Sequence, residues 1–212
     1  MTARLRIGVL LSGEGTTFEA LCQAIDAGRV PGDVVVVIAS KEKAGGLARA
    51  ERHGIPAVAI PRKSYPDVAA FNDRIHIELA KHGVDFVACL GFLSPFELRG
   101  RYDGRAINTH PALIPAFCGK GFYGGRVHEA VLASGVKVSG ATVHFCDDRY
   151  DTGPIILQEA VPVLDDDTPD SLAARVQAVE RRLVPEAIRL FAEDRLTIEG
   201  RSVRVKLPAR AS

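Results

Sequence analysis

Apolar and polar positions alternate in blocks along the first half of the chain. Continuous apolar runs, which suit strands buried on both faces, occupy residues 5–11, 34–39, 57–60 and 86–90. Apolar residues at helical spacing, each set closed by a glycine, occupy the intervals 16–28, 44–54 and 66–83. Strands that alternate with helices predict a mostly parallel sheet with helices on both faces.

Local signals add detail to this pattern. Thr16 followed by Glu19 has the form of a helix capping box. Residues 91–95 are expected to form a loop followed by one or two helical turns up to Arg99, and 106–108 to end a fifth strand.

The pattern changes after Pro111. Residues 112–125 are rich in glycine and contain three aromatic residues, which predicts a long loop of functional importance or a disordered surface segment. A helix is expected at 127–134. Two strands at 138–146 and 154–163, joined by the acidic turn 147–153, predict antiparallel pairing.

A late helix is expected to begin around Thr168 and Pro169, and Pro185 either kinks it or begins a new turn. A terminal hairpin is expected at 196–205. The predicted fold is therefore α/β, with a mostly parallel twisted sheet of about seven strands and antiparallel strands in its C-terminal part. We expect one domain over 1–212, divided into halves at 5–110 and 111–195 and a terminal hairpin and tail at 196–212.

Composition narrows the functional class. The 212 residues are 47% hydrophobic, and 27 Lys and Arg against 26 Asp and Glu give a formal net charge of +1. This balance gives no indication of nucleic-acid binding, and no apolar run approaches the roughly 20 residues of a membrane span. The four cysteines are far apart, and no His, Asp or Glu cluster has metal-ligand spacing. We expect a reduced, cytoplasmic protein that acts on small molecules without a metal, as a monomer or weak homodimer.

The stretch Ala106–Pro111 contains the leading candidates for chemistry. Residues two apart on a strand point to the same side, so Asn108 and His110 can face one reacting group together. Pro111 favours an extended His110 and cannot donate to a central ladder, which places the pair where a strand leaves its sheet. The alternative is an ordinary strand end with a structural histidine.

A glycine loop follows the first strand. Ser12–Thr17 contains Gly13, Gly15, Thr16 and Thr17 and opens a helix, where backbone N–H groups favour an anion. It lacks the Gly-Lys-Ser/Thr of a P-loop and the third glycine of a dinucleotide fingerprint. The pattern predicts a phosphomonoester site, and an ordinary tight turn is the alternative.

Three other polar residues have weaker signals. Asp151 lies in an acidic turn and would orient His110 and favour its imidazolium form if the two were in contact. His144 alternates with apolar residues and is interpreted as a packed structural histidine. His128, beside Glu129 on a helix, is expected at the surface.

Four motifs occur in a characteristic order, namely Ser12-Gly13-x-Gly15-Thr16, Asn108-x-His110-Pro111-x-Leu113-x-Pro115, Gly140-x-x-Val143-His144-Phe145 and Asp151-x-Gly153-Pro154-Ile155. Together they resemble the folate-dependent formyltransferases, over about residues 5–191. The glycine loop is similar to the branch that acts on glycinamide ribonucleotide in purine biosynthesis. The resemblance implies a Rossmann-like formyltransferase fold and the co-substrate 10-formyltetrahydrofolate.

The resemblance also implies roles for particular residues. Asn108, His110 and Asp151 would be catalytic, with Asn108 and a protonated His110 donating to the oxyanion or the leaving nitrogen. The loop Gly13–Thr17 would bind the substrate phosphate, and Gln177 and Glu180 the ribonucleotide. The residues implied to contact the folate are Phe92, Leu93, Asp147, Asp148, Arg149 and Tyr150.

The chain departs from the family pattern in three places. Thr16-Thr17 stands where Ser-Asn is usual, and the arginines that the family places near the folate are missing, with Arg62 and Lys63 nearby. The loop after Pro115 is longer, and we expect it to close over the site as a lid that excludes water.

Other functions stay open from the sequence. They include formylation of a sugar-nucleotide amine, hydrolysis of formyltetrahydrofolate and non-catalytic binding of a phosphate or nucleotide. Transfer-RNA formyltransferases are disfavoured because the chain ends before their additional domain and has no basic surface signal.

Overall fold

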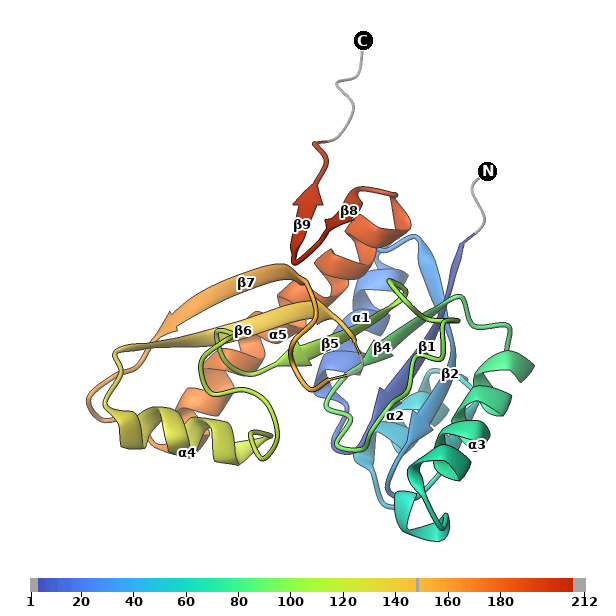
Figure 1. The fold of residues 1–212 in the computed structure, drawn as a ribbon, viewed down its shortest axis with the longest axis horizontal. Coiled ribbons are helices and arrows are strands. Elements are labelled where there is room, and N and C mark those ends of the chain that lie inside the picture. Colours follow the sequence, from blue (N-terminus) through green and yellow to red (C-terminus); the bar gives the residue numbers. More distant parts are fainter. Residues whose placement is uncertain (1–3, 148, 208–212) are drawn as a thin grey trace.

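The computed structural model describes residues 4–147 and 149–207, which form one nine-stranded sheet flanked by helices (Figure 1). The strands are β1 (Leu5–Leu11), β2 (Gly32–Ala39), β3 (Ala57–Ala59), β4 (Phe86–Cys89), β5 (Ala106–His110), β6 (Val138–Phe145), β7 (Ile155–Pro162), β8 (Leu196–Glu199) and β9 (Ser202–Val205). The helices are α1 (Thr16–Asp26), α2 (Gly45–Arg52), α3 (Val68–Lys81), α4 (Gly125–Ser134) and α5 (Pro169–Ala192), with a 3₁₀ turn η1 (Arg62–Ser64).

The strand order is β3-β2-β1-β4-β5-β6-β7-β9-β8. Strands β1 to β5 pair in parallel, and β6 and β7 add antiparallel strands beside β5, as the sequence predicted. The predicted number of about seven strands is wrong, because the terminal hairpin joins the sheet. A single parallel pairing of Ser202 with Ile155 links β9 to β7. The order reverses between β1 and β4, the topological switch point where α/β sheets commonly bind ligands.

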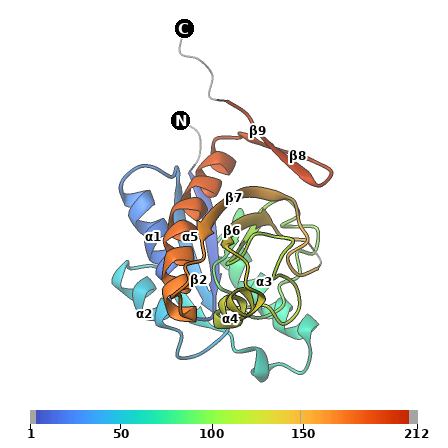
Figure 2. The same ribbon diagram turned by 90° about the vertical axis from the view of Figure 1, so that its left-hand side faces the viewer.

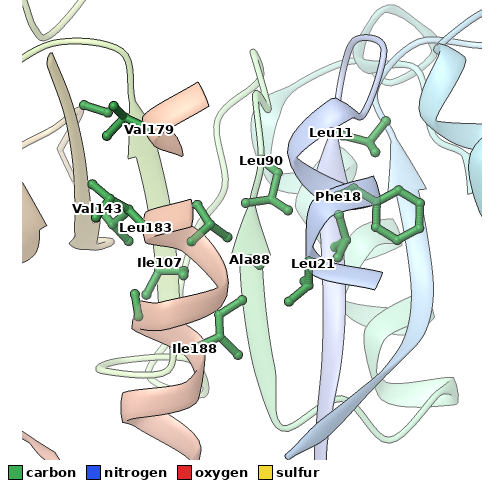
Figure 3. Packing of buried hydrophobic residues seen from close by; sticks show 14 of the residues in the cluster. Leu11, Phe18, Leu21, Ala88, Leu90, Ile107, Val143, Val179, Leu183 and Ile188 are labelled. Atoms are coloured by element: carbon green, nitrogen blue, oxygen red, sulfur yellow. The ribbon is translucent and has the colours of Figure 1, made fainter. Parts of the chain in front are cut away.

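Two hydrophobic clusters cover the two faces of the sheet. Helices α1, α2, α4 and α5 contribute to one cluster, and α3 contributes to the other. Figure 2 shows α1 and α5 side by side on the first face. Figure 3 shows Leu183 and Ile188 of α5 beside Ile107 of β5, and Phe18 and Leu21 of α1 belong to the same cluster. The sheet therefore has both faces covered, which explains the nearly continuous apolar runs of its central strands.

Helix capping differs from the sequence prediction at the start of α1. The capping box predicted at Thr16 and Glu19 does not form, because the N-cap of α1 is Gly15, in the left-handed conformation with φ 72°. Glu19 instead binds Arg49 and His53. A real capping box occurs at α5, where Thr168 and Ser171 bind each other's backbone N–H groups.

One further expectation about helices is wrong. The segment between Pro95 and Arg99 forms no helix and is irregular. It is held by Asn72, whose side chain contacts the backbone of Pro95 and Glu97. Pro185 lies inside α5, which continues without interruption to Ala192. Within 4–147 and 149–207, no helix has both the length and the hydrophobicity that crossing a bilayer requires.

Candidate active site

Asn108 and His110 converge on Asp151, as the sequence suggested. The Asn108 Nδ2 atom donates to Asp151 Oδ1 at 3.3 Å, and His110 Nδ1 lies 3.5 Å from Asp151 Oδ2. The side chains of His110 and Asp151 are 4% and 9% exposed, so this contact is shielded from water. Strand β5 extends through His110 and ends before Pro111, which places both residues where the strand leaves the sheet.

The turn between β6 and β7 brings Asp151 to β5 by folding back across the sheet. Gly153 permits this path, because a Cβ atom there would lie 1.8 Å from the carbonyl oxygen of Phe145. Asp151 itself has φ 57°, a conformation that is uncommon for residues other than glycine and often occurs at functional sites. Gly153 and the conformation of Asp151 thus account for the Asp-x-Gly-Pro motif.

His144 is a fourth member of the cluster, which the sequence interpretation as a packed structural histidine missed. It lies opposite Asn108 in the β5–β6 ladder, and its Nε2 atom accepts from Asn108 Nδ2 at 3.1 Å and lies 3.6 Å from Asp151 Oδ1. The pairing of β6 with β7 shifts register at this residue, which is a β-bulge. Only the register of β6 against β5 reveals this neighbour, and the local sequence does not contain that register.

The loop 112–125 contacts the cluster through its backbone. His110 Nε2 donates to the carbonyl oxygen of Phe117 at 2.9 Å, and the N–H of Gly119 donates to Asp151 Oδ2 at 2.8 Å. Phe117 has φ 51°, and its ring packs on Phe122 in a T-shaped pair with centroids 6.5 Å apart. The loop is therefore fixed to the candidate catalytic residues rather than separate from them.

Burial shifts the pKa values of His110 and Asp151 in opposite directions, and neighbouring polar groups oppose the effect of burial on each. Burial lowers the pKa of His110, which outweighs the raising effects of Asp151 and the Phe117 carbonyl. Burial raises the pKa of Asp151, but the contact with His144, the charge of His110 and the Gly119 amide together hold that pKa below its ordinary value. The free site thus contains a carboxylate beside a histidine that favours its neutral form more than usual.

His128 is buried, contrary to the expectation that it lies at the surface. It is 3% exposed in the first turn of α4, and its Nδ1 atom has no hydrogen-bond partner among the described residues. Burial, and then the charge of His110, lower its pKa, so it lies within electrostatic reach of the cluster.

The glycine loop has the form that the sequence predicted. Gly15 allows a tight entry into α1, since its φ is 72° and an added Cβ atom would lie 2.8 Å from the Cα of Gly46. Gly13 is exposed, and a Cβ atom there would meet nothing within 4 Å. Thr16 and Thr17 are the first residues of α1, so their N–H groups are without intrahelical partners and available to an anion.

The loop after β4 is tied directly to the glycine loop. The N–H of Leu93 donates to Ser12 Oγ at 2.8 Å, and Ser12 Oγ lies 2.6 Å from Ser40 Oγ. Leu93 is 49% exposed, whereas Phe92 stacks on Phe71 with centroids 6.3 Å apart. Of these two residues that the resemblance places at the folate, Leu93 is thus the open one and Phe92 is largely a packing partner of α3.

The turn after β6 contains the remaining folate candidates. Asp147 closes the turn by accepting from Thr152 Oγ1 at 2.7 Å and from the N–H of Arg149. Arg149 and Tyr150 are exposed, and Asp148 lies outside the described residues. A separate pocket of about 460 Å³ joins Leu93 to Arg62 and Lys63, the basic residues near the missing family arginines.

Glu180 and Gln177 lie on α5. Glu180 is 7% exposed and accepts from Thr109 Oγ1 at 2.9 Å, while Gln177 is half-buried. Among the described residues, no group of three or more His, Cys, Asp or Glu side chains has a metal-binding arrangement.

The fold and the site together define the class of the chain. Residues 5–188 match the family model described as formyl transferase, and the chain belongs to that family.

Within the family, the similarity is to phosphoribosylglycinamide formyltransferases. The chloroplastic enzymes of that name from Arabidopsis thaliana and Vigna unguiculata are each 41% identical over 196 residues, or 91% of this chain, which spans 67% and 62% of their lengths. The crystal structure of glycinamide ribonucleotide transformylase 1 from Symbiobacterium toebii matches with a TM-score of 0.91 and 44% identity, covering 97% of this chain and 96% of that chain.

Proposed function

We propose that this chain transfers the formyl group of 10-formyltetrahydrofolate to the amine of glycinamide ribonucleotide in purine biosynthesis. The observation that carries the proposal is the buried contact of Asn108 and His110 with Asp151, in a formyl transferase whose glycine loop opens α1. The acceptor is inferred from the names of the relatives, and the type of reaction is inferred from the side chains of the cluster.

The cluster supplies the hydrogen-bond donor and the proton acceptor that the transfer requires. The substrate amine attacks the formyl carbon, a carbon–nitrogen bond forms, and the carbonyl oxygen becomes an oxyanion. Asn108 Nδ2 donates to this oxyanion in place of one of its contacts with His144 and Asp151. One such preorganised donor typically contributes about 10²–10³ in rate.

His110 handles the proton. The resemblance implied a protonated His110. We instead assign it a neutral starting form that accepts the proton of the attacking amine, because burial lowers its pKa. The resulting imidazolium is stabilised by Asp151 Oδ2 and the carbonyl of Phe117, and it then donates the proton to N10 as the bond between N10 and the formyl carbon breaks.

The remaining assignments follow the division of the chain. We assign residues 5–110 to the half that binds the substrate phosphate, through Gly13, Gly15, Thr16 and Thr17, and 111–195 to the catalytic and folate half. Gln177 and Glu180 bind the ribonucleotide. The folate contacts are Phe92, Leu93, Asp147, Asp148, Arg149 and Tyr150. A single domain over 1–212, a cytoplasmic location and a monomeric or weakly dimeric state complete the proposal.

A panel of acceptors tests the proposed function directly. The purified chain is incubated with 10-formyltetrahydrofolate and glycinamide ribonucleotide, a sugar-nucleotide amine or water alone, and the products are identified by mass spectrometry. We expect formyl-glycinamide ribonucleotide as the main product. Formylation of the sugar-nucleotide amine, or formate released at the same rate in all three reactions, would assign the chain to one of the alternative activities.

A further inference from the structure

The face of β5 that points away from the catalytic cluster also contains a polar contact. Alternate residues of a strand face opposite sides, so Thr109 lies on the face opposite Asn108 and His110. Thr109 shares this face with Ile107, which packs beneath α5 (Figure 3). Its Oγ1 atom donates to Glu180 Oε1 at 2.9 Å, and the two residues are each 7% exposed.

The two oxygens of the Glu180 carboxylate have different surroundings. Oε1 is held by Thr109, whereas Oε2 has no hydrogen-bond partner among the described residues. The fully buried side-chain atoms without a partner in that part of the chain are Arg74 Nη1, His128 Nδ1 and Ser139 Oγ, so Oε2 of Glu180 is not sealed from solvent. A nearly buried carboxylate thus presents one oxygen to whatever occupies the site.

The charge of Glu180 is weakly compensated. Burial raises its pKa to about 7, against the lowering effects of the Thr109 hydrogen bond and the charge of Arg181. The elements packed against α5 contribute other titratable or charged groups, namely Glu19 and Asp26 on α1, Arg126, His128 and Glu129 on α4, His144 on β6 and Glu159 on β7. Of these, Glu19 pairs with Arg49 and His53, Glu159 pairs with Arg182, and His144 faces Asp151.

We propose that Thr109 is a positioning residue that holds one carboxylate oxygen of Glu180, so that the other oxygen accepts hydrogen bonds from hydroxyl groups of the bound ribonucleotide. This inference rests on the proposed function, and on ribonucleotide binding by Glu180 in particular. It assigns the two faces of β5 to different tasks, with chemistry on the side of Asn108 and His110 and substrate binding on the side of Thr109.

The test replaces Thr109 with valine, which keeps the shape of the side chain and removes the hydroxyl. Hydrogen bonds to charged groups are stronger than those between neutral groups, so we expect the KM for glycinamide ribonucleotide to rise about tenfold or more at pH 7. The KM for the folate and the turnover number should change much less. Thr109→Ser restores the hydroxyl and should restore the KM.

A pH profile separates positioning from a structural role. Binding requires ionised Glu180, so the KM for the ribonucleotide should rise as the pH falls below about 7 in the unmodified protein. Thr109→Val removes a contact that lowers this pKa, so the rise should begin at a higher pH. Glu180→Gln should raise the KM and abolish this dependence.

Ser139→Ala is the matched control, because it removes another buried hydroxyl, one without a hydrogen-bond partner in the described part of the chain. It should leave both KM values near their original level. If Thr109→Val fails to fold, Thr109→Ala and Glu180→Gln replace it in the same measurements.

The negative results have different meanings. If the unmodified protein does not formylate glycinamide ribonucleotide, the proposed function fails. If it does, but folded Thr109→Val keeps its KM and pH profile, the positioning role is wrong. Equal increases in both KM values with an unshifted profile would also overturn it, by showing a structural effect only.

Discussion

The glycine loop and the Asn108–His110–Asp151 cluster lie on the same sheet but are built in different ways. The loop 12–17 is continuous in sequence and offers mainly backbone groups, because a tight left-handed turn at Gly15 exposes the first N–H groups of α1. The cluster is assembled from side chains on β5, on β6 and in the turn before β7, supported by two backbone contacts from the loop 112–125.

This difference indicates how substrate binding and catalysis are divided between the glycine loop and the cluster. A backbone site can hold a phosphate with little dependence on side-chain identity, so the proposed phosphate site is compatible with Thr16-Thr17 in place of Ser-Asn. Chemistry requires one particular side chain at each position. Substitutions in the cluster should therefore affect kcat, and changes in the loop should affect KM for the ribonucleotide.

The largest effect is expected from the cluster. His110→Ala and Asn108→Ala should each lower kcat by at least about 10², since each removes an interaction that acts mainly in the transition state. Steady-state kinetics measures the effect, and thermal unfolding verifies that the variants are folded. Near-normal turnover in a folded variant would show that the residue has no catalytic role.

Asp151→Asn should also lower kcat by about two orders of magnitude, because it removes the charge that stabilises the imidazolium. The pH profile provides a second readout. Burial lowers the pKa of His110, so the acid limb of kcat/KM should lie below the ordinary histidine pKa of about 6.5.

Asp151 raises the pKa of His110, so the Asn variant should move this acid limb to still lower pH. An acid limb that moves to higher pH would contradict this electrostatic coupling. An unmoved limb would assign it to another group.

An intermediate effect is expected at the glycine loop. Gly13→Val adds a side chain in open space within the loop, and it should raise the KM for glycinamide ribonucleotide about tenfold, equivalent to ~1.4 kcal/mol. The KM for the folate should change little. Equal increases for both substrates would place the phosphate elsewhere.

Gly15→Val is the contrasting variant at the same loop. It forces a β-branched residue to φ 72° with its Cβ atom 2.8 Å from Gly46, so it should destabilise the protein by roughly 1–3 kcal/mol. A Gly13 variant that loses as much stability in thermal unfolding would not report on phosphate binding.

The smallest effect on transfer is expected from the loop 112–125. Replacing Phe122 and Tyr123, which are 36% and 42% exposed, with serine should lower transfer modestly and raise the ratio of formylfolate hydrolysis to transfer. Closure of the loop would exclude water, which competes with the amine for the formyl carbon.

Hydrogen exchange provides an independent readout for this loop. Exchange across 112–125 should slow when both substrates are bound. Unchanged exchange together with an unchanged hydrolysis ratio would show that the loop is not a lid.

The same comparison explains which features the sequence could predict. The strand–glycine loop–helix unit and the pair Asn108 and His110 depend on residues close in sequence. The spacing of apolar residues and the positions of glycine and proline were sufficient to predict them. The contribution of His144 depends on its register opposite Asn108, and the burial of His128 depends on how α4 packs. Neither register nor packing is encoded in the neighbouring residues.

Predictions from local sequence patterns were also wrong where tertiary contacts determined the structure. The pattern Thr16-x-x-Glu19 suggested a capping box, but Glu19 binds Arg49 and His53 instead. The strand count failed because one pairing, between Ile155 and Ser202, attaches the terminal hairpin to the sheet. Thr109 had no signal of its own, since its partner Glu180 lies 71 residues away.

The most direct test of this division compares binding and chemistry in one preparation of Asn108→Ala. The Kd for glycinamide ribonucleotide is measured by calorimetry, and formyl transfer is followed in a single turnover with both substrates saturating. We predict a Kd close to that of the unmodified protein and a transfer rate at least about 10² lower. A transfer rate close to normal would contradict the assignment of the chemistry to this cluster.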